Sequence, residues 1–280
     1  MIKIDIDANR HFWLDGILKK QLDTIIYNIN NGFDFLIIIT GTGLTRVGKT
    51  TLAQQIGFYV ASKLGTPFTN ENVVFGGADL MTKAGELPHK SVIVDDESRE
   101  DISAKSQMDF FNKQLITFFN ECGMYNHLII LVATDFFDFC KSIALTRAEL
   151  LINCIRTSKP AIDPDGNEVV ELGRGWYELY DRTGKKRLYR EGKKDYDTYL
   201  SKYRFAYGEF RDYWVIDKEQ YEIKKLEFLK RNRMKRSETR KISYVCKGLH
   251  DQGWTNIKIG ELIHANRLEV KRYMDMANDI

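Results

Sequence analysis

The chain has 280 residues, of which 43% are hydrophobic, so it is long enough for one full-sized domain with its own core and one or two small additions. Its net charge of +3 is unevenly distributed: residues 224–280 contain 14 Lys and Arg against 7 Asp and Glu, and the first 223 residues carry a net −4. A basic tail is typical of a protein that meets a polyanion, and equally of a solvated charged helix.

Cysteine spacing and hydropathy exclude several classes of protein. The four cysteines are widely spaced and form no C-x-x-C pair, and the five histidines form no H-E-x-x-H motif. We therefore expect neither a zinc site nor a disulfide framework. No apolar segment has the length that spans a bilayer, and the N-terminus lacks a signal-peptide pattern. We expect a soluble protein without a membrane partner, located in the cytoplasm, which is the host cytoplasm if the protein is viral.

Short apolar runs alternate with longer helical patterns along the first 160 residues. Continuous apolar runs, rather than alternating ones, are typical of a parallel sheet that is covered on both faces. The predicted strands lie at 35–40, 72–75, 91–94, 127–133 and 150–155, and the predicted helices lie at roughly 49–64, 104–122 and 136–147. This alternation predicts an α/β fold with a mainly parallel, doubly wound sheet over residues 1–160.

A second region follows residue 160. The segment 175–191 is predicted to form a β-hairpin with Asp-Arg-Thr-Gly at its tip, and an aromatic-rich stretch comes after it. We expect this annex, residues 161–223, to pack onto the core, although its aromatic side chains could also stack on bases. Residues 224–240 are predicted to be a basic helix or linker, and residues 241–280 a small helical domain.

A glycine-rich loop lies between the first of these strands and the helix after it. Its residues match the pattern G-x-x-x-x-G-K-[ST] and are Gly43, Leu44, Thr45, Arg46, Val47, Gly48, Lys49 and Thr50. The pattern is specific because it has four fixed positions and lies between a strand and a helix. Backbone N–H groups of such a loop, together with the positive end of the helix dipole, offset the charge of a triphosphate. The loop therefore predicts an ATP site.

The side chains of the loop have separate expected roles around ATP. Lys49 is expected to reach the β- and γ-phosphates, and the Thr50 hydroxyl to bind Mg²⁺. Thr51 supplies an adjacent hydroxyl that could touch the α-phosphate. Arg46 is expected to face solvent, with a phosphate contact as the alternative.

Three acids, Asp95, Asp96 and Glu97, follow the predicted strand 91–94. A P-loop enzyme needs a carboxylate near its magnesium, and a hydrolase also needs a base that orients the attacking water. We favour Asp96 for magnesium and Glu97 for the water. Asp95 and Asp96 in those two roles are the second choice, and three surface acids in a loop are the structural alternative.

The order of the predicted strands bears on the class of ATPase. The predicted strand at 72–75 leaves room for a sheet in which another strand lies between the loop strand and the acidic strand. That layout, with Glu97, points to the branch of P-loop ATPases that has a catalytic glutamate. Most kinases and GTP switches lack this residue.

Two further polar side chains are candidates for the same site. Thr134, with Asp135, follows a predicted strand and could contact the γ-phosphate or the attacking water; an ordinary strand-end turn is the alternative. Arg147 precedes the next strand and could approach the phosphates of its own or a neighbouring subunit, as an arginine finger does. A plain surface salt bridge is the competing interpretation of Arg147.

The run from "VDDES" at 94–98 to "RAELLINC" at 147–154 resembles P-loop ATPases of phages and other mobile elements. These are often labelled zonular occludens toxin-like and are related to the FtsK/HerA type, which includes viral genome-packaging motors. The resemblance extends over roughly residues 20–225 and is strongest in the two nucleotide motifs. It implies magnesium-dependent ATP hydrolysis, a homo-oligomeric ring and DNA movement. The chain departs from many relatives in having Gly123 where they have an arginine after the cysteine.

The segment 255–276 is similar to a helix-turn-helix. Thr255 is expected to cap its first helix, and the turn is His-Ala-Asn. The first helix bears Ile259, Leu262 and Ile263. Leu268 and Val270 are expected to pack inward from the second helix, and the residues expected to face largely outward are Arg267, Glu269, Lys271 and Arg272. Together with the basic stretch 224–241, this segment predicts DNA binding, with a helical lid or an oligomerisation element as the alternative.

These features together predict a magnesium-dependent ATPase that acts on DNA. The most specific version is a genome-packaging or translocation motor of a virus or mobile element. One alternative is a non-motor ATP switch, such as a helicase loader or transposition regulator. The other is a nucleoside or nucleotide kinase, in which the C-terminal helices would have no evident role.

Overall fold

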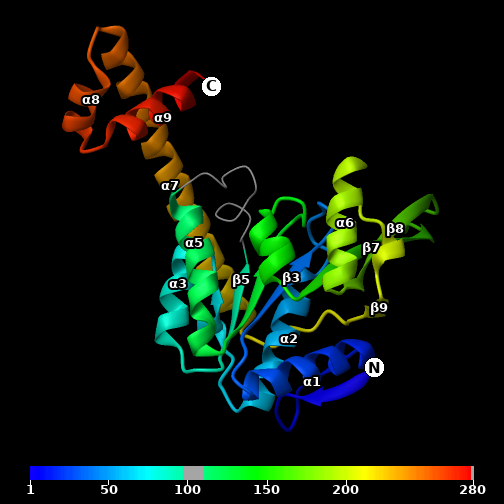
Figure 1. The fold of residues 1–280 in the computed structure, drawn as a ribbon. Coiled ribbons are helices and arrows are strands. Elements are labelled where there is room, and N and C mark those ends of the chain that lie inside the picture. The colour runs from blue at the N-terminus through cyan, green and yellow to red at the C-terminus, as the bar shows by residue number, and fades with distance from the viewer. Residues whose placement is uncertain (97–109, 279–280) are drawn as a thin grey trace. The chain divides into compact units, whose positions relative to one another are not determined.

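The computed structural model of the protein describes residues 1–96 and 110–278, so Glu97 lies outside the described residues. The chain divides into two compact units, Met1–Tyr221 and Glu222–Ile280 (Figure 1). The predicted core and nearly all of the predicted annex therefore share the first unit. The predicted basic linker and the C-terminal helices share the second unit.

The first unit contains a two-stranded sheet, β1-β2, and a seven-stranded sheet with the order β4-β5-β6-β3-β7-β8-β9. The strands are β1 (Ile2–Asp5), β2 (His11–Leu14), β3 (Phe35–Thr40), β4 (Val73–Val74), β5 (Val92–Asp96), β6 (Leu128–Val132), β7 (Leu150–Ile162), β8 (Glu168–Tyr180) and β9 (Ala206–Glu209). From β4 to β7 the neighbouring strands of the large sheet are parallel, and β8 and β9 continue it in antiparallel fashion. The prediction of an α/β protein with a mainly parallel sheet is confirmed.

Helices cover both faces of this sheet. They are α1 (Gly16–Asn30), α2 (Lys49–Leu64), α3 (Gly77–Glu86), α5 (Phe110–Glu121) and α6 (Arg182–Lys194). Leu36 and Ile38 of β3 share one core with buried residues of α3, α5 and α6. Successive strand residues point to opposite faces, and α2 packs on the sheet from the other face with α1 against it (Figure 1).

The position of β6 in the sheet decides which residues meet. It lies between β3 and β5, with Ile38 opposite Leu131 on one side and Asp95 opposite Leu131 on the other. A strand therefore does separate the loop strand from the acidic strand, but it is β6. The predicted strand at 72–75 forms β4, which is the edge strand of the sheet and pairs with β5 on the side away from β6. Because these strands are parallel, their C-terminal ends gather at one edge, where ligands of such sheets bind.

The predicted hairpin at 175–191 is wrong. The long antiparallel pair is β7 with β8, and the chain turns between them at 163–167, where the Asp163 amide donates to the Asn167 carbonyl at 3.0 Å. Residues 182–194 form α6, because the Asp181 carboxylate caps the helix by accepting from the Gly184 amide at 2.6 Å. The Asp-Arg-Thr-Gly sequence therefore starts a helix here, although its residues also suit a turn.

The predicted helices at 104–122 and 136–147 also differ from the observed elements. The helix expected at 136–147 is reduced to a π-helical turn at Ser142–Arg147, because Phe136, Phe137 and Phe139 all enter the core beside α6 instead of sharing one helix face. The helix expected at 104–122 is α5 from Phe110, and its earlier part lies outside the described residues. The helix α1, which follows the β1-β2 pair, was not predicted.

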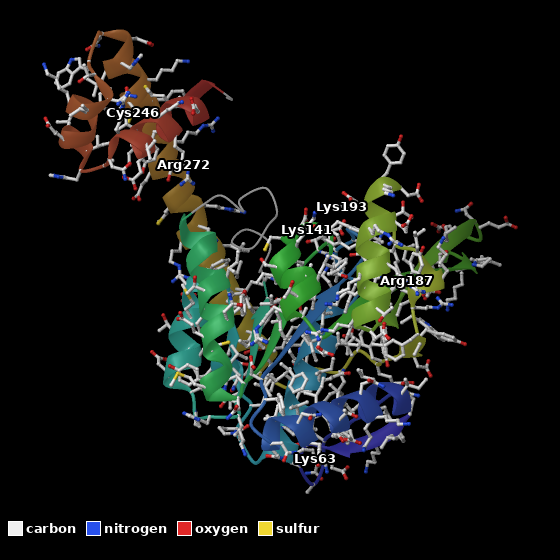
Figure 2. The ribbon with its side chains drawn as sticks, viewed as in Figure 1. Lys63, Lys141, Arg187, Lys193, Cys246 and Arg272 are labelled. Carbon is white, nitrogen blue, oxygen red and sulfur yellow. The ribbon has the colours of Figure 1, made fainter. Side chains whose placement is uncertain are left out.

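The second unit, as far as residue 278, consists of helices. The long helix α7 (Lys218–Asp251) begins in the first unit, and α8 (Asn256–Ile263) and α9 (Arg267–Asn278) follow it. Cys246, labelled in Figure 2, packs with Ile259 and Val270 as the small core of this unit. The Thr255 hydroxyl caps α8 by accepting from the Lys258 amide, as predicted.

One leucine of the second unit does not occupy its predicted position. Leu268 is 79% exposed, although it was expected to pack inward. The Asn266 side chain caps α9 by accepting from the Leu268 and Glu269 amides. Val270, two residues beyond Leu268, then faces the core, and a two-residue step in a helix turns Leu268 to the opposite side.

Within residues 1–96 and 110–278, no helix combines the length and the apolar character that crossing a bilayer requires.

Candidate nucleotide site

The glycine-rich loop has the backbone that its sequence predicts. Gly43 and Gly48 have φ values of 73° and 92°, in the left-handed region that favours glycine. The Val47 side chain is buried beneath the loop, where a Cβ on Gly41 would lie 2.5 Å from Val47 Cγ2. The loop therefore folds over Val47, with Arg46 exposed at its outer side.

The loop leads directly into the N-terminus of α2. Gly48 occupies the cap position, and among the described residues no side chain caps this helix start. Lys49 Nζ donates to the Leu44 carbonyl at 2.7 Å, so the lysine ammonium lies across the loop. Backbone amides at a helix start, with a lysine above them, form an arrangement that attracts phosphate.

Of the two described acids at the end of β5, Asp96 reaches the loop. The Thr50 hydroxyl donates to Asp96 Oδ1 at 3.0 Å and lies 3.2 Å from Oδ2, although the two residues are 46 positions apart. Asp95 points to the other face of β5, where its carboxylate accepts from the Gly76 amide at 2.8 Å. The geometry favours Asp96 over Asp95 as the carboxylate near a metal on Thr50. The role expected of Glu97 stays a prediction.

The donor set at this point suits magnesium. Mg²⁺ prefers oxygen ligands and is usually held by one or two protein groups together with substrate phosphates and water. The Thr50 hydroxyl and the Asp96 carboxylate supply such oxygens. Within the described residues there is no cluster of three or more His, Cys, Asp or Glu side chains that could hold a metal alone. The two oxygen groups of Thr50 and Asp96 suit a metal that arrives with a nucleotide.

Thr134 lies where β6 ends, beside the loop. Its carbonyl accepts from the Gly41 amide at 3.3 Å and from the Gly43 amide at 3.1 Å. The backbone of Thr134 thus fastens β6 to the start of the loop. The contact of its hydroxyl with a γ-phosphate or with the attacking water stays a prediction.

Asp135 and Tyr199 form a small polar cluster next to Thr134. The Tyr199 hydroxyl donates to Asp135 Oδ1 at 3.1 Å and lies 3.1 Å from the Thr40 hydroxyl. Burial raises the pKa of the Asp135 carboxyl. Tyr199 is 159 positions from Thr40, so the sequence contains no signal for this contact.

Arg147 is not beside the loop of its own chain. Its guanidinium forms an ion pair with Asp34 and its Nε donates to the Phe119 carbonyl at 2.6 Å. Asp34 precedes β3 and the loop follows β3, so these two features lie at opposite ends of that strand. Within one subunit the salt-bridge interpretation therefore describes the Arg147 side chain. The alternative contact with the phosphates of a neighbouring subunit stays a prediction.

A different arginine contacts the loop. Arg156 of β7 donates from Nη2 to the Thr45 carbonyl at 3.0 Å across 111 residues. Asn153, three residues earlier on the same strand, accepts from the Thr42 amide through its side-chain oxygen at 3.1 Å. Sequence patterns gave no reason to select either residue, because both reach the loop only through the pairing of β7 with β3.

The segment after β9, residues 210–216, runs along the start of α2. A Cβ on Gly48 would lie 2.7 Å from the Phe210 ring, and the Thr51 hydroxyl donates to Asp212 at 3.3 Å. Gln55 Nε2 donates to the carbonyls of Arg211 and Tyr213. This part of the predicted annex therefore forms a wall of the site.

Comparison with solved structures finds a similarity to the genome packaging NTPase B204 of Sulfolobus turreted icosahedral virus 2, which was solved in complex with AMPPCP. The two chains are 10% identical, the similarity covers 55% of this chain and 95% of the other, and the TM-score is 0.34. No protein-family model and no curated protein matches the chain.

Proposed function

We propose that this protein is a magnesium-dependent ATP hydrolase of the P-loop class that acts on DNA. The observation that carries the proposal is the Thr50–Asp96 hydrogen bond at 3.0 Å, which joins the glycine-rich loop to the acidic strand. In P-loop enzymes a threonine hydroxyl and an acidic strand together hold the metal of the nucleotide. The position of β6 between β3 and β5 supports the branch with a catalytic glutamate, for which Glu97 is the candidate.

The proposed site gives each residue one task. Amides of residues 43–50 and the Lys49 ammonium hold the phosphates, and Thr51 touches the α-phosphate. The Thr50 hydroxyl and the Asp96 carboxylate would hold Mg²⁺, which when bound would supply positive charge that offsets the charge of the phosphates. Glu97 and Thr134 orient the attacking water.

DNA is the proposed partner, and a genome-packaging or translocation motor built as a homo-oligomeric ring is the specific version. The support for DNA is the excess of basic residues from 224 onward and the exposed basic side chains of α9, Arg267 and Lys271. Phosphate contacts by such side chains supply most of the affinity of nonspecific DNA binding.

The test is the ATPase rate with and without DNA, together with the oligomeric mass in the presence of a non-hydrolysable ATP analogue. We expect hydrolysis that needs Mg²⁺, rises with DNA and disappears in Lys49→Ala. Lys63→Ala is the matched control, because Lys63 lies in the last turn of the same helix (Figure 2). Unchanged nucleotide binding by Lys49→Ala would contradict the site.

The same measurements separate the alternatives. Hydrolysis without ATP-driven displacement along DNA would indicate a switch in place of a motor. Phosphoryl transfer to a small acceptor, with no effect of DNA, would indicate a nucleoside or nucleotide kinase.

A further inference from the structure

Asp96 is held by two hydroxyl groups from distant parts of the chain. The Thr50 hydroxyl donates to Oδ1 at 3.0 Å, and the Tyr221 hydroxyl donates to Oδ2. Asp96 is 4% exposed and Tyr221 is 6% exposed, so both hydrogen bonds are shielded from water. A buried carboxylate and a buried phenol each need such a partner, because leaving either unsatisfied is costly.

Aromatic packing fixes the Tyr221 ring. Its centroid lies 5.0 Å from that of Trp214 and 5.6 Å from that of Phe75. Trp214 belongs to the segment after β9, and the neighbouring amides of Val215 and Ile216 donate to Gln54 of α2. The hydroxyl is therefore held in place from two sides.

We propose that Tyr221 is a positioning residue for the metal site, which orients the Asp96 carboxylate toward Thr50 before the metal and nucleotide bind. The inference rests on the proposed function and adds a residue that is 125 positions from Asp96. Hydrogen bonds that orient a metal-binding carboxylate typically contribute about 10–100-fold to metal affinity.

A competing geometry makes the opposite prediction. If the Tyr221 hydroxyl occupied the carboxylate oxygen that a metal-bound water must use, its removal would strengthen metal binding. The Thr50 hydrogen bond favours the positioning role, because a threonine can donate its proton to Asp96 while its oxygen binds Mg²⁺. Removal of the Tyr221 hydroxyl therefore lowers metal affinity if Tyr221 positions Asp96, and raises it if Tyr221 competes with the metal.

The experiment uses the full chain with the substitution Tyr221→Phe, which keeps the ring and removes the hydroxyl. With a non-hydrolysable ATP analogue bound, Mn²⁺ affinity is measured by electron paramagnetic resonance and Mg²⁺ affinity by calorimetry. We expect the affinity for both metals to fall by about 10-fold. Affinity for the analogue in excess EDTA should stay the same, because Tyr221 is proposed to act on the metal carboxylate alone.

Tyr27→Phe is the matched control, because Tyr27 is 68% exposed on α1. It should leave metal affinity unchanged. Unchanged or stronger metal binding by Tyr221→Phe overturns the positioning role, and so does an equal loss of analogue binding in EDTA, which would indicate a general structural defect. If the wild-type chain bound no nucleotide, the proposed function itself would be contradicted. Failure of the proposed function is therefore distinguishable from failure of the Tyr221 role.

Discussion

Lys185 of α6 is a fully buried lysine. Its ammonium donates to the backbone carbonyls of Ala144, at 2.6 Å, and Ala148. Burial disfavours the charged form and lowers the pKa of Lys185 from 10.5 to about 8. Between these two values the unfolded chain binds more protons than the folded chain, so the free energy of unfolding rises with pH. Below the lower value both states are protonated and the penalty is constant.

The substitution Lys185→Met is therefore expected to remove this rise. Since one pKa unit corresponds to about 1.4 kcal/mol, the stability of wild type relative to the variant should increase by on the order of 1–3 kcal/mol between about pH 7.5 and pH 10. Urea unfolding at both pH values measures the change. Lys186→Met, at an exposed neighbouring position, should parallel wild type. A constant difference between wild type and Lys185→Met would contradict the lowered pKa.

At the scale of elements, α2 does more than carry the loop residues. Two of its side chains, Gln54 and Gln55, are buried and hydrogen-bond the backbone of the segment after β9. Gln54 Oε1 accepts from the Val215 amide at 2.9 Å and from the Ile216 amide at 3.2 Å. The helix thus fixes the segment that carries Trp214 beside the nucleotide site.

Gln54→Met is expected to lower the free energy of unfolding of the first unit by about 2–4 kcal/mol. Methionine keeps much of the volume, but it leaves two buried amides without an acceptor, and each such group costs about 1–3 kcal/mol. Denaturant unfolding measures the loss, and Lys63→Met on the exposed end of the same helix should lie within about 0.5 kcal/mol of wild type. A loss below about 1 kcal/mol for Gln54→Met would show that water replaces the lost acceptor.

At the scale of the whole molecule, the chain combines a unit that contains the candidate nucleotide site with a small helical unit. The second unit has a core of Cys246, Ile259 and Val270, to which the last part of α7 contributes. Deletion from residue 241 would cut α7 and remove this core. Surface substitutions are therefore the sharper test of DNA binding.

The double substitution Arg267→Ala with Lys271→Ala is expected to weaken DNA binding and leave the basal ATPase rate unchanged. Both side chains are exposed on α9, and each lost phosphate contact should reduce the slope of log affinity against log salt by about one. Fluorescence anisotropy at several salt concentrations measures affinity and slope together. Lys19→Ala with Lys20→Ala, on α1, is the control pair. An unchanged slope for the α9 variant would exclude this helix from the DNA interface.

Local patterns predicted the elements whose signals lie within one segment. The strand 35–40 and the helix 49–64 were predicted at their observed bounds, because a continuous apolar run, a glycine loop and a terminal Gly65 define them locally. The hairpin at 175–191 failed because Asp181 suits a turn and a helix cap equally, and only packing of the residues that follow decides between them. The prediction of a helix at 136–147 failed because the spacing of its apolar residues is compatible with a helix and equally with an irregular segment that packs into the core.

The sequence by itself determined the strand–loop–helix with its lysine and threonine, and it narrowed the metal carboxylate to three adjacent acids. Only the tertiary structure decided among the described acids, because strand alternation turns Asp96 toward Thr50 and Asp95 toward Gly76. It also brought Tyr221 and Arg156 to the site and placed Arg147 at the far end of β3. Contacts between residues more than a hundred positions apart depend on strand order and helix packing, and a local pattern carries no information about either.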